Sequence, residues 1–237
     1  MPDTRDSYFL DSYIDNLIEK AEKSSDLGLW YGKTGVAVTL FCMEQLIQNK
    51  KYKETAIKLI DTVCDNISSS ELNPDFANGL SGIGCGFEYI ISNKFVEGNS
   101  DKILSDIDFV LLSIINRRTL DKIRLEDGIC GIGYYLYNRL KNKNSNENTL
   151  QTLQIKEYLI YLTDWLEEEL NKTCGYYEIC DIYFLLCRLR KLNIFNYKIN
   201  KMAGLCLGKL GADSNKNIYD SYFCMGIPSL KLLKNSF

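Results

Sequence analysis

The chain has 237 residues, of which 46% are hydrophobic and 25% are charged, ordinary usage for a globular protein and enough chain for a large core. The net charge is −3, with lysine and arginine spread among the acids, so we expect no nucleic-acid partner, which would require a basic face. The sequence contains no histidine, which excludes Ser-His and Cys-His mechanisms and histidine metal ligands within these residues.

The sequence also lacks membrane and export signals. No stretch reaches about 18 uninterrupted apolar residues, and residues 1–6 lack the basic-then-apolar order of a signal peptide. We therefore expect a cytoplasmic protein with no membrane partner, whose nine cysteines are mostly reduced and buried.

The predicted elements are helices of two kinds that alternate along the chain. Residues 7–23 place apolar side chains at 10, 13, 14, 17, 18 and 21, the spacing of an amphipathic helix. Further amphipathic helices are predicted at 51–68, 100–117, 150–170 and 196–209. The helices between them are more apolar and are predicted at 34–48, about 79–93, 130–141, 176–191 and 222–234. The result is ten helices in five hairpins, with no sheet.

A glycine phrase begins the more apolar helices. The pattern Gly-x-x-Gly-[Ile/Val]-[Gly/Ala] starts at Gly32, Gly79 and Gly128, 47 and 49 residues apart, and weaker copies follow near residues 175 and 226. A fixed interval of about 48 residues indicates stacked two-helix repeats. We expect glycine here because it adopts positive φ and lacks a Cβ, so the chain turns sharply into a helix that touches its neighbours. No strand precedes the phrase, which argues against a phosphate loop.

Such hairpins bury their apolar faces only against neighbouring copies, in an open solenoid or a closed ring. In a ring the more apolar helices lie inside and the amphipathic helices outside. The N-termini of the inner helices then converge at one end of a central cavity, where their dipoles present partial positive charge. We expect the functional site at this end, which we call the cavity mouth.

The glycine phrases at 29–37, 78–84 and 127–133 resemble those of the lanthionine synthetase C-like family. The resemblance extends over nearly the whole chain as a repeat pattern. It implies a single all-α domain over residues 1–237 with the fold of an α/α toroid. Family members usually have seven hairpins and this chain has about five, so the ring is expected to be small, incomplete or completed by a partner.

Active members of that family are similar in a zinc site built from a Trp-Cys-Tyr-Gly phrase and a Cys-His-Gly phrase, and they close thioether rings in a precursor peptide. Here residues 29–32 read Leu-Trp-Tyr-Gly, without the cysteine, and residues 224–226 read Cys-Met-Gly, without the histidine. The resemblance therefore implies a member that lacks the zinc cyclase site and uses no cofactor. Such a protein would act as an accessory that binds a peptide or a modifying enzyme.

Aromatic and acidic residues beside the phrases are the candidate ligand-binding residues. Rings at the mouth could stack on an extended peptide or could fill a narrow interior, and acids there could be ordinary helix caps. The residues predicted for the mouth are Trp30, Tyr31, Asp127, Tyr176, Asp181 and Tyr222.

Two enzymatic alternatives stay open. Cysteines near the starts of inner helices could bind zinc without histidine and retain cyclase activity, or could be small core residues; they are Cys130, Cys180 and Cys224. Paired carboxylates could serve as acid and base in a carbohydrate hydrolase, an idea that rests on fold analogy alone. The acids concerned are Asp75, Glu126, Asp127, Glu178 and Asp181.

Overall fold

The computed structural model describes residues 4–67, 72–143 and 149–212, and within these ranges the chain is helical with no strand. The helices are α1 (Thr4–Lys23), α2 (Lys33–Ile47), α3 (Lys50–Ile67), α4 (Leu80–Ser92), α5 (Ser100–Ile103), α6 (Ser105–Arg117), α7 (Ile129–Lys141), α8 (Leu150–Asn171), α9 (Tyr176–Leu189), the 3₁₀ turn η1 (Arg190–Leu192) and α10 (Asn196–Ala212). The all-α prediction is confirmed for this part of the chain.

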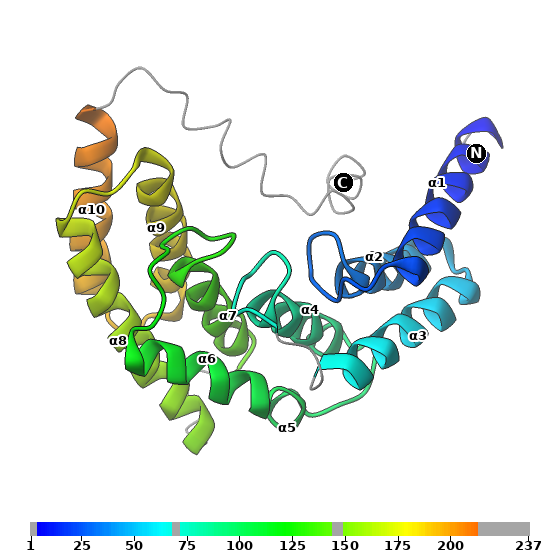
Figure 1. The fold of residues 1–237 in the computed structure, drawn as a ribbon, viewed down its shortest axis with the longest axis horizontal. Coiled ribbons are helices and arrows are strands. Elements are labelled where there is room, and N and C mark those ends of the chain that lie inside the picture. Colours follow the sequence, from blue (N-terminus) through cyan, green and yellow to red (C-terminus); the bar gives the residue numbers. More distant parts are fainter. Residues whose placement is uncertain (1–3, 68–71, 144–148, 213–237) are drawn as a thin grey trace.

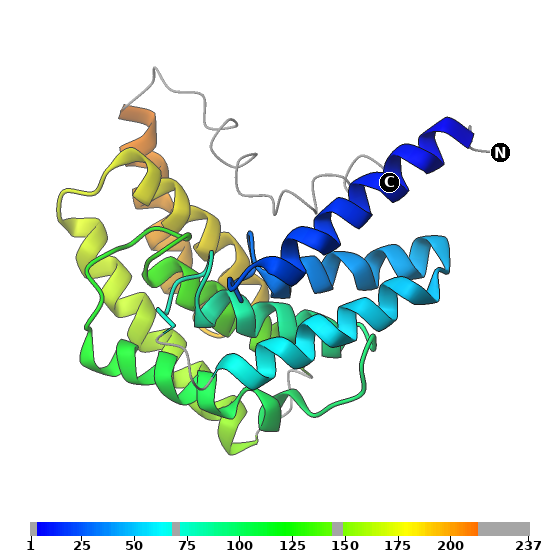
Figure 2. The ribbon, with the colours of Figure 1, turned by 45° about the vertical axis from the view of Figure 1, so that its right-hand side comes forward.

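The described helices follow one another in an open arc, from α1 at one end to α10 at the other (Figure 1). An inner row is formed by α2, α4, α7 and α9, which pack against one another in that order. The remaining long helices lie outside this row, with α6 packed on α8, and Figure 2 shows α3 and α6 along the outer side from a second direction. This alternation of inner and outer helices agrees with the predicted hairpins.

The two kinds of helix differ in burial as predicted. In α2 every residue from Lys33 to Phe41 is buried, whereas α3 buries only Tyr52, Ala56, Leu59 and Val63, at spacings of three and four residues. An inner helix is covered by the neighbouring inner helices and by outer helices, so it is apolar all round. An outer helix buries one stripe and leaves the rest to water.

One predicted element differs from the structure, and another lies outside the described residues. The amphipathic helix expected at 100–117 is divided at Leu104, which leaves the helical conformation and buries its side chain. The predicted start at Ser100 is capped by the Asn99 side chain, which accepts hydrogen bonds from two main-chain N–H groups. The helix predicted at 222–234 lies outside the described residues.

Of the two properties for which glycine was expected, the missing Cβ is needed and the positive φ is not. No described glycine has positive φ, so the sharp turn does not depend on that conformation. Instead, a Cβ on the second glycine of each clear phrase would lie 1.8, 1.9 or 2.5 Å from the carbonyl oxygen six residues earlier. These glycines are Gly35, Gly82 and Gly131. Their role is therefore to let the preceding loop lie directly on the first turn of the helix.

Candidate functional site

Each inner helix from α2 to α7 is preceded by a loop that folds back on its first turn. In the α2 loop (residues 24–32), the N–H of Lys33 donates to the Asp26 carbonyl at 2.9 Å, and Thr34 Oγ1 donates to the Leu27 carbonyl at 2.6 Å. Equivalent bonds reach seven residues back from the starts of α4 and α7, closing the α4 loop (72–79) and the α7 loop (118–128). Three successive loops therefore have one shape.

These three loops are joined by main-chain hydrogen bonds. The N–H groups of Leu29 and Trp30 both donate to the carbonyl of Ala77, at 3.0 and 2.9 Å. One repeat further on, the N–H groups of Phe76 and Ala77 both donate to the carbonyl of Glu126, each at 3.0 Å. We call these contacts the loop–loop hydrogen bonds. They hold the N-termini of α2, α4 and α7 side by side, as the repeat predicts for the cavity mouth.

The fourth copy of the repeat replaces a carbonyl with a side chain. The α9 loop (172–175) is short, and the N–H of Leu125 donates to Asp181 Oδ2 at 3.0 Å. The same carboxylate is paired with the guanidinium of Arg124 and is only 2% exposed. Burial by itself lowers the pKa of Arg124, and the hydrogen bond and charge of Asp181 outweigh it and raise that pKa. Asp181 thus serves to hold the α7 loop.

A row of aromatic rings crosses the mouth from α2 to α9. Trp30 meets Tyr31 edge to face, with ring centroids 6.5 Å apart, and meets Phe76 in the same way at 6.4 Å. Phe76 then contacts Tyr134 at 5.5 Å, and Tyr134 contacts Phe184 at 5.7 Å. The Tyr31 end of the row is 65% exposed. The indole N–H of Trp30 is shielded from solvent and has no acceptor among the described residues.

Two further tyrosines lie at the start of α9. Tyr176 and Tyr177 meet edge to face at 5.5 Å, and the guanidinium of Arg124 lies 5.3 Å from the centroid of the Tyr177 ring. Tyr177 is 53% exposed. Arg124 therefore links the Asp181 anchor to an exposed ring, a role that the sequence analysis missed. In the sequence, Arg124 is marked only by its position directly before Leu125, whose N–H donates to Asp181.

The remaining predicted acid of the mouth is also paired. Asp127 Oδ2 lies 2.7 Å from Lys122 Nζ. Asp75 belongs to the same group, because burial and then the charge of Asp127 raise its pKa, against a smaller effect of Lys122. The α4 and α7 loops thus bring two carboxylates and one lysine into electrostatic contact. The sequence analysis did not select Lys122.

Two of the three cysteines considered as zinc ligands lie within the described residues. Cys130 and Cys180 are both buried, and burial raises the pKa of the Cys130 thiol well above its usual value, so it is protonated near neutral pH. Within residues 4–67, 72–143 and 149–212, no three cysteines or acids are grouped in a way that could hold a metal ion. Cys224 and Tyr222 lie outside the described residues.

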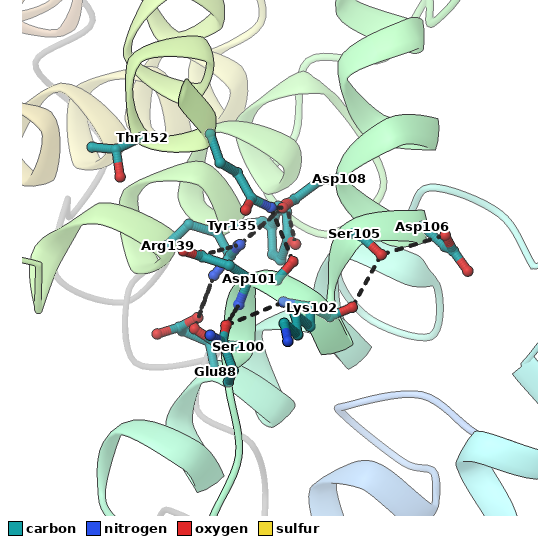
Figure 3. A network of polar contacts seen from close by, with 12 residues as sticks. Glu88, Ser100, Asp101, Lys102, Ser105, Asp106, Asp108, Tyr135, Arg139 and Thr152 are labelled. Atoms are coloured by element: carbon teal, nitrogen blue, oxygen red, sulfur yellow. Dashed lines mark hydrogen bonds and ion pairs between the residues drawn. The ribbon is translucent and has the colours of Figure 1, made fainter. Parts of the chain in front are cut away.

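A second polar cluster lies away from the mouth, around Arg139 near the end of α7 (Figure 3). This guanidinium is 0% exposed; it binds both oxygens of Asp108, at 3.2 and 2.9 Å, Glu88 at 2.8 Å and Asp101 at 2.9 Å. The Tyr135 hydroxyl donates to Asp108 at 2.5 Å. The cluster ties α4, α5, α6 and α7 together through paired charges, and we read it as structural.

Comparison with known proteins gives one family. The model of the lanthionine synthetase C-like proteins matches residues 2–90 and 24–178. The two matches overlap, as expected of a chain built from internal repeats. No curated protein matches this sequence. None of the described helices is long and apolar enough to cross a membrane.

Proposed function

Because the chain belongs to the lanthionine synthetase C-like family, we propose that it is a peptide-binding accessory protein of ribosomal peptide modification. In this proposal the described arc is a section of an α/α toroid, and its working site is the cavity mouth rather than a zinc centre. The ligand is an extended precursor peptide that stacks on the exposed rings of the mouth.

The row of rings at the mouth is the observation that carries the proposal. An edge-to-face series that runs from a buried ring to an exposed one offers an apolar surface with fixed orientation, and rigid aromatic side chains give contact area at little entropic cost. Tyr31 is the exposed member of the row, and Tyr177 is a second exposed ring, at the start of α9. Both carry hydroxyl groups that can bond to a peptide.

The groups that would be needed for catalysis are committed to other contacts. Asp181 is buried against Arg124 and a main-chain N–H. Cys130 is buried and protonated, so it supplies no thiolate. Binding without turnover is the activity that agrees best with these contacts.

The test is a binding titration. A fluorescein-labelled linear peptide rich in Ser, Thr and Cys is titrated with the full chain and followed by fluorescence polarisation. Replacement of Tyr31 by Ala is expected to weaken binding roughly three- to tenfold, the effect of removing one stacked ring. Tyr197→Ala is the matched control, because Tyr197 is an exposed tyrosine on α10. Equal affinity of the two variants would contradict the proposal.

A second candidate function rests on the carboxylates. Asp75 has a raised pKa and interacts electrostatically with Asp127, which is paired with Lys122, and a pair of carboxylates can serve as acid and base in hydrolysis of a glycosidic bond. Turnover of a carbohydrate panel by the native chain, abolished in Asp127→Asn, would support this function. A panel without turnover removes it.

A further inference from the structure

We propose that Trp30 binds the main chain of a peptide at a turn, with its carbonyl accepting two consecutive N–H groups and its indole N–H donating to a peptide carbonyl. The inference deepens the proposed function and rests on it. It names the part of the mouth that holds the peptide and the chemical feature that the peptide must carry.

The first argument is the repeat of the loop–loop hydrogen bonds. Trp30, Ala77 and Glu126 occupy equivalent positions, two residues before the first glycine of each phrase. The carbonyls of Ala77 and Glu126 each accept two consecutive N–H groups from the preceding loop. Trp30 lies in the first loop of the described chain, and its carbonyl accepts no hydrogen bond from the described residues. The same local fold therefore presents an acceptor with no donor pair.

The second argument is the indole of Trp30. Its Nε1 is shielded from solvent and lacks an acceptor within the described ranges. A buried donor without an acceptor costs roughly 1–3 kcal/mol, and that cost is removed when a ligand supplies a carbonyl. An acceptor and a donor on one residue match the N–H and C=O groups of a peptide main chain.

The first residue of each donor pair also packs its side chain against a glycine of the next copy. The first donor of each pair, Leu29 or Phe76, places its Cβ 3.0 or 2.8 Å from the position of a Cβ on the glycine of the next copy, Gly82 or Gly131. At the equivalent Gly35, the three nearest atoms all belong to Leu29 of its own loop. No side chain of another described loop comes as close to Gly35 as Leu29 and Phe76 come to Gly82 and Gly131.

These positions define the ligand. It is a segment that turns and carries two consecutive free N–H groups, the first on an apolar or aromatic residue, as with Leu29 and Phe76. Proline at either position removes a required donor. A helical peptide is excluded, because its N–H groups are already bonded within the helix.

The probe is a labelled synthetic peptide with the sequence of residues 73–79, Asn-Pro-Asp-Phe-Ala-Asn-Gly, which in the structure supplies the donor pair to Glu126. Its affinity for the full chain is measured by fluorescence polarisation. We expect N-methylation at the position of Phe76 or of Ala77 to weaken binding at least tenfold. N-methylation at the position of Asn78, whose N–H bonds no other loop, is the matched control and is expected to change affinity less than twofold.

The protein side is tested with Trp30→Phe, which keeps a ring and removes the indole N–H. We expect a three- to tenfold loss of affinity, with an unchanged urea midpoint. Trp165→Phe is the control, since it removes the other tryptophan, which is buried in α8. If the peptide fails to bind at about 1 mM, or binds without regard to N-methylation, the inference is wrong. The proposed function survives that result when Tyr31-dependent binding of Ser-, Thr- and Cys-rich peptides persists, and falls only when this binding is absent too.

Discussion

Replacing Gly82 with Ala tests whether the glycine phrase serves close packing. Gly82 lies in the first turn of α4, in helical conformation, where Ala is intrinsically the better residue by about 1 kcal/mol. Helix propensity alone therefore predicts stabilisation. The structure predicts the opposite, because a Cβ at this position would lie 1.9 Å from the carbonyl oxygen of Phe76. The main chain of the α4 loop would have to move.

The cost can be worked from the contacts that this movement disturbs. Forcing an extra carbon into a packed site costs typically 1–3 kcal/mol. The N–H groups of Phe76 and Ala77 bond to Glu126 from the displaced loop, and two weakened hydrogen bonds add about 1 kcal/mol each. After the gain in helix propensity is subtracted, the expected net loss is about 2–4 kcal/mol.

The assay is urea unfolding of the full chain, with the free energy of unfolding taken from the midpoint and the slope. Gly208→Ala is the matched control, because Gly208 is also helical and a Cβ there would meet no atom within 4 Å. That control should be neutral or stabilised by up to about 1 kcal/mol. A Gly82→Ala variant as stable as Gly208→Ala would refute the reasoning.

Three further predictions concern buried and titrating groups. Arg139→Met leaves two buried carboxylates without their counter-charge and should cost about 3–5 kcal/mol in urea unfolding, against under about 0.5 kcal/mol for the exposed Arg190→Met. The Arg139 variant should also become more stable as the pH falls from 7 to 5. Its unpaired buried carboxylates bind protons more readily in the folded chain than in the unfolded chain. Burial by itself raises the pKa of Asp101, and the hydrogen bonds from Lys143 and Arg139 outweigh it and lower that pKa. Its contribution is therefore present above the unfolded pKa of about 3.9 and is lost as the pH falls through the lower folded value, so the stability of Asp101→Asn should fall less steeply with acid. Cys130 should resist iodoacetamide in native protein and react in urea, read by mass spectrometry; rapid native alkylation would contradict its burial.

Local patterns in the sequence predicted most of the described helices, though not the division between α5 and α6. Apolar spacing of three and four residues depends only on near neighbours in the chain, and it predicted α1 and α3 to within a few residues. The interval between Gly32, Gly79 and Gly128 also predicted that the starts of the inner helices lie side by side, which the loop–loop hydrogen bonds confirm for three copies. Periodicity contains this information because equivalent residues occupy equivalent places in a stack.

The Arg139 cluster could not be predicted in this way. Its partners come from α4, α5 and α6, between 31 and 51 residues away in sequence. From the sequence alone, one arginine near the end of an apolar helix is interpreted as a surface charge at that helix terminus. Only the packing of α4, α6 and α7 shows that the guanidinium is enclosed, and that packing depends on contacts outside any local window.

Asp181 shows why a repeat pattern predicts the place of a site more readily than the task of a residue within it. Between the loops of the first three copies, a main-chain carbonyl accepts the linking hydrogen bonds from two N–H groups, which does not depend on side-chain identity. In the fourth copy the short α9 loop supplies no such carbonyl to Leu125, and a carboxylate from α9 takes its place. A buried carboxylate, unlike a carbonyl, requires a counter-charge, and Arg124 supplies it directly before Leu125. Asp181 and Arg124 together therefore replace one missing main-chain carbonyl. Because one oxygen of Asp181 is used by both Arg124 and Leu125 and the residue is 2% exposed, this acid is placed to hold the α7 loop and not to meet a substrate.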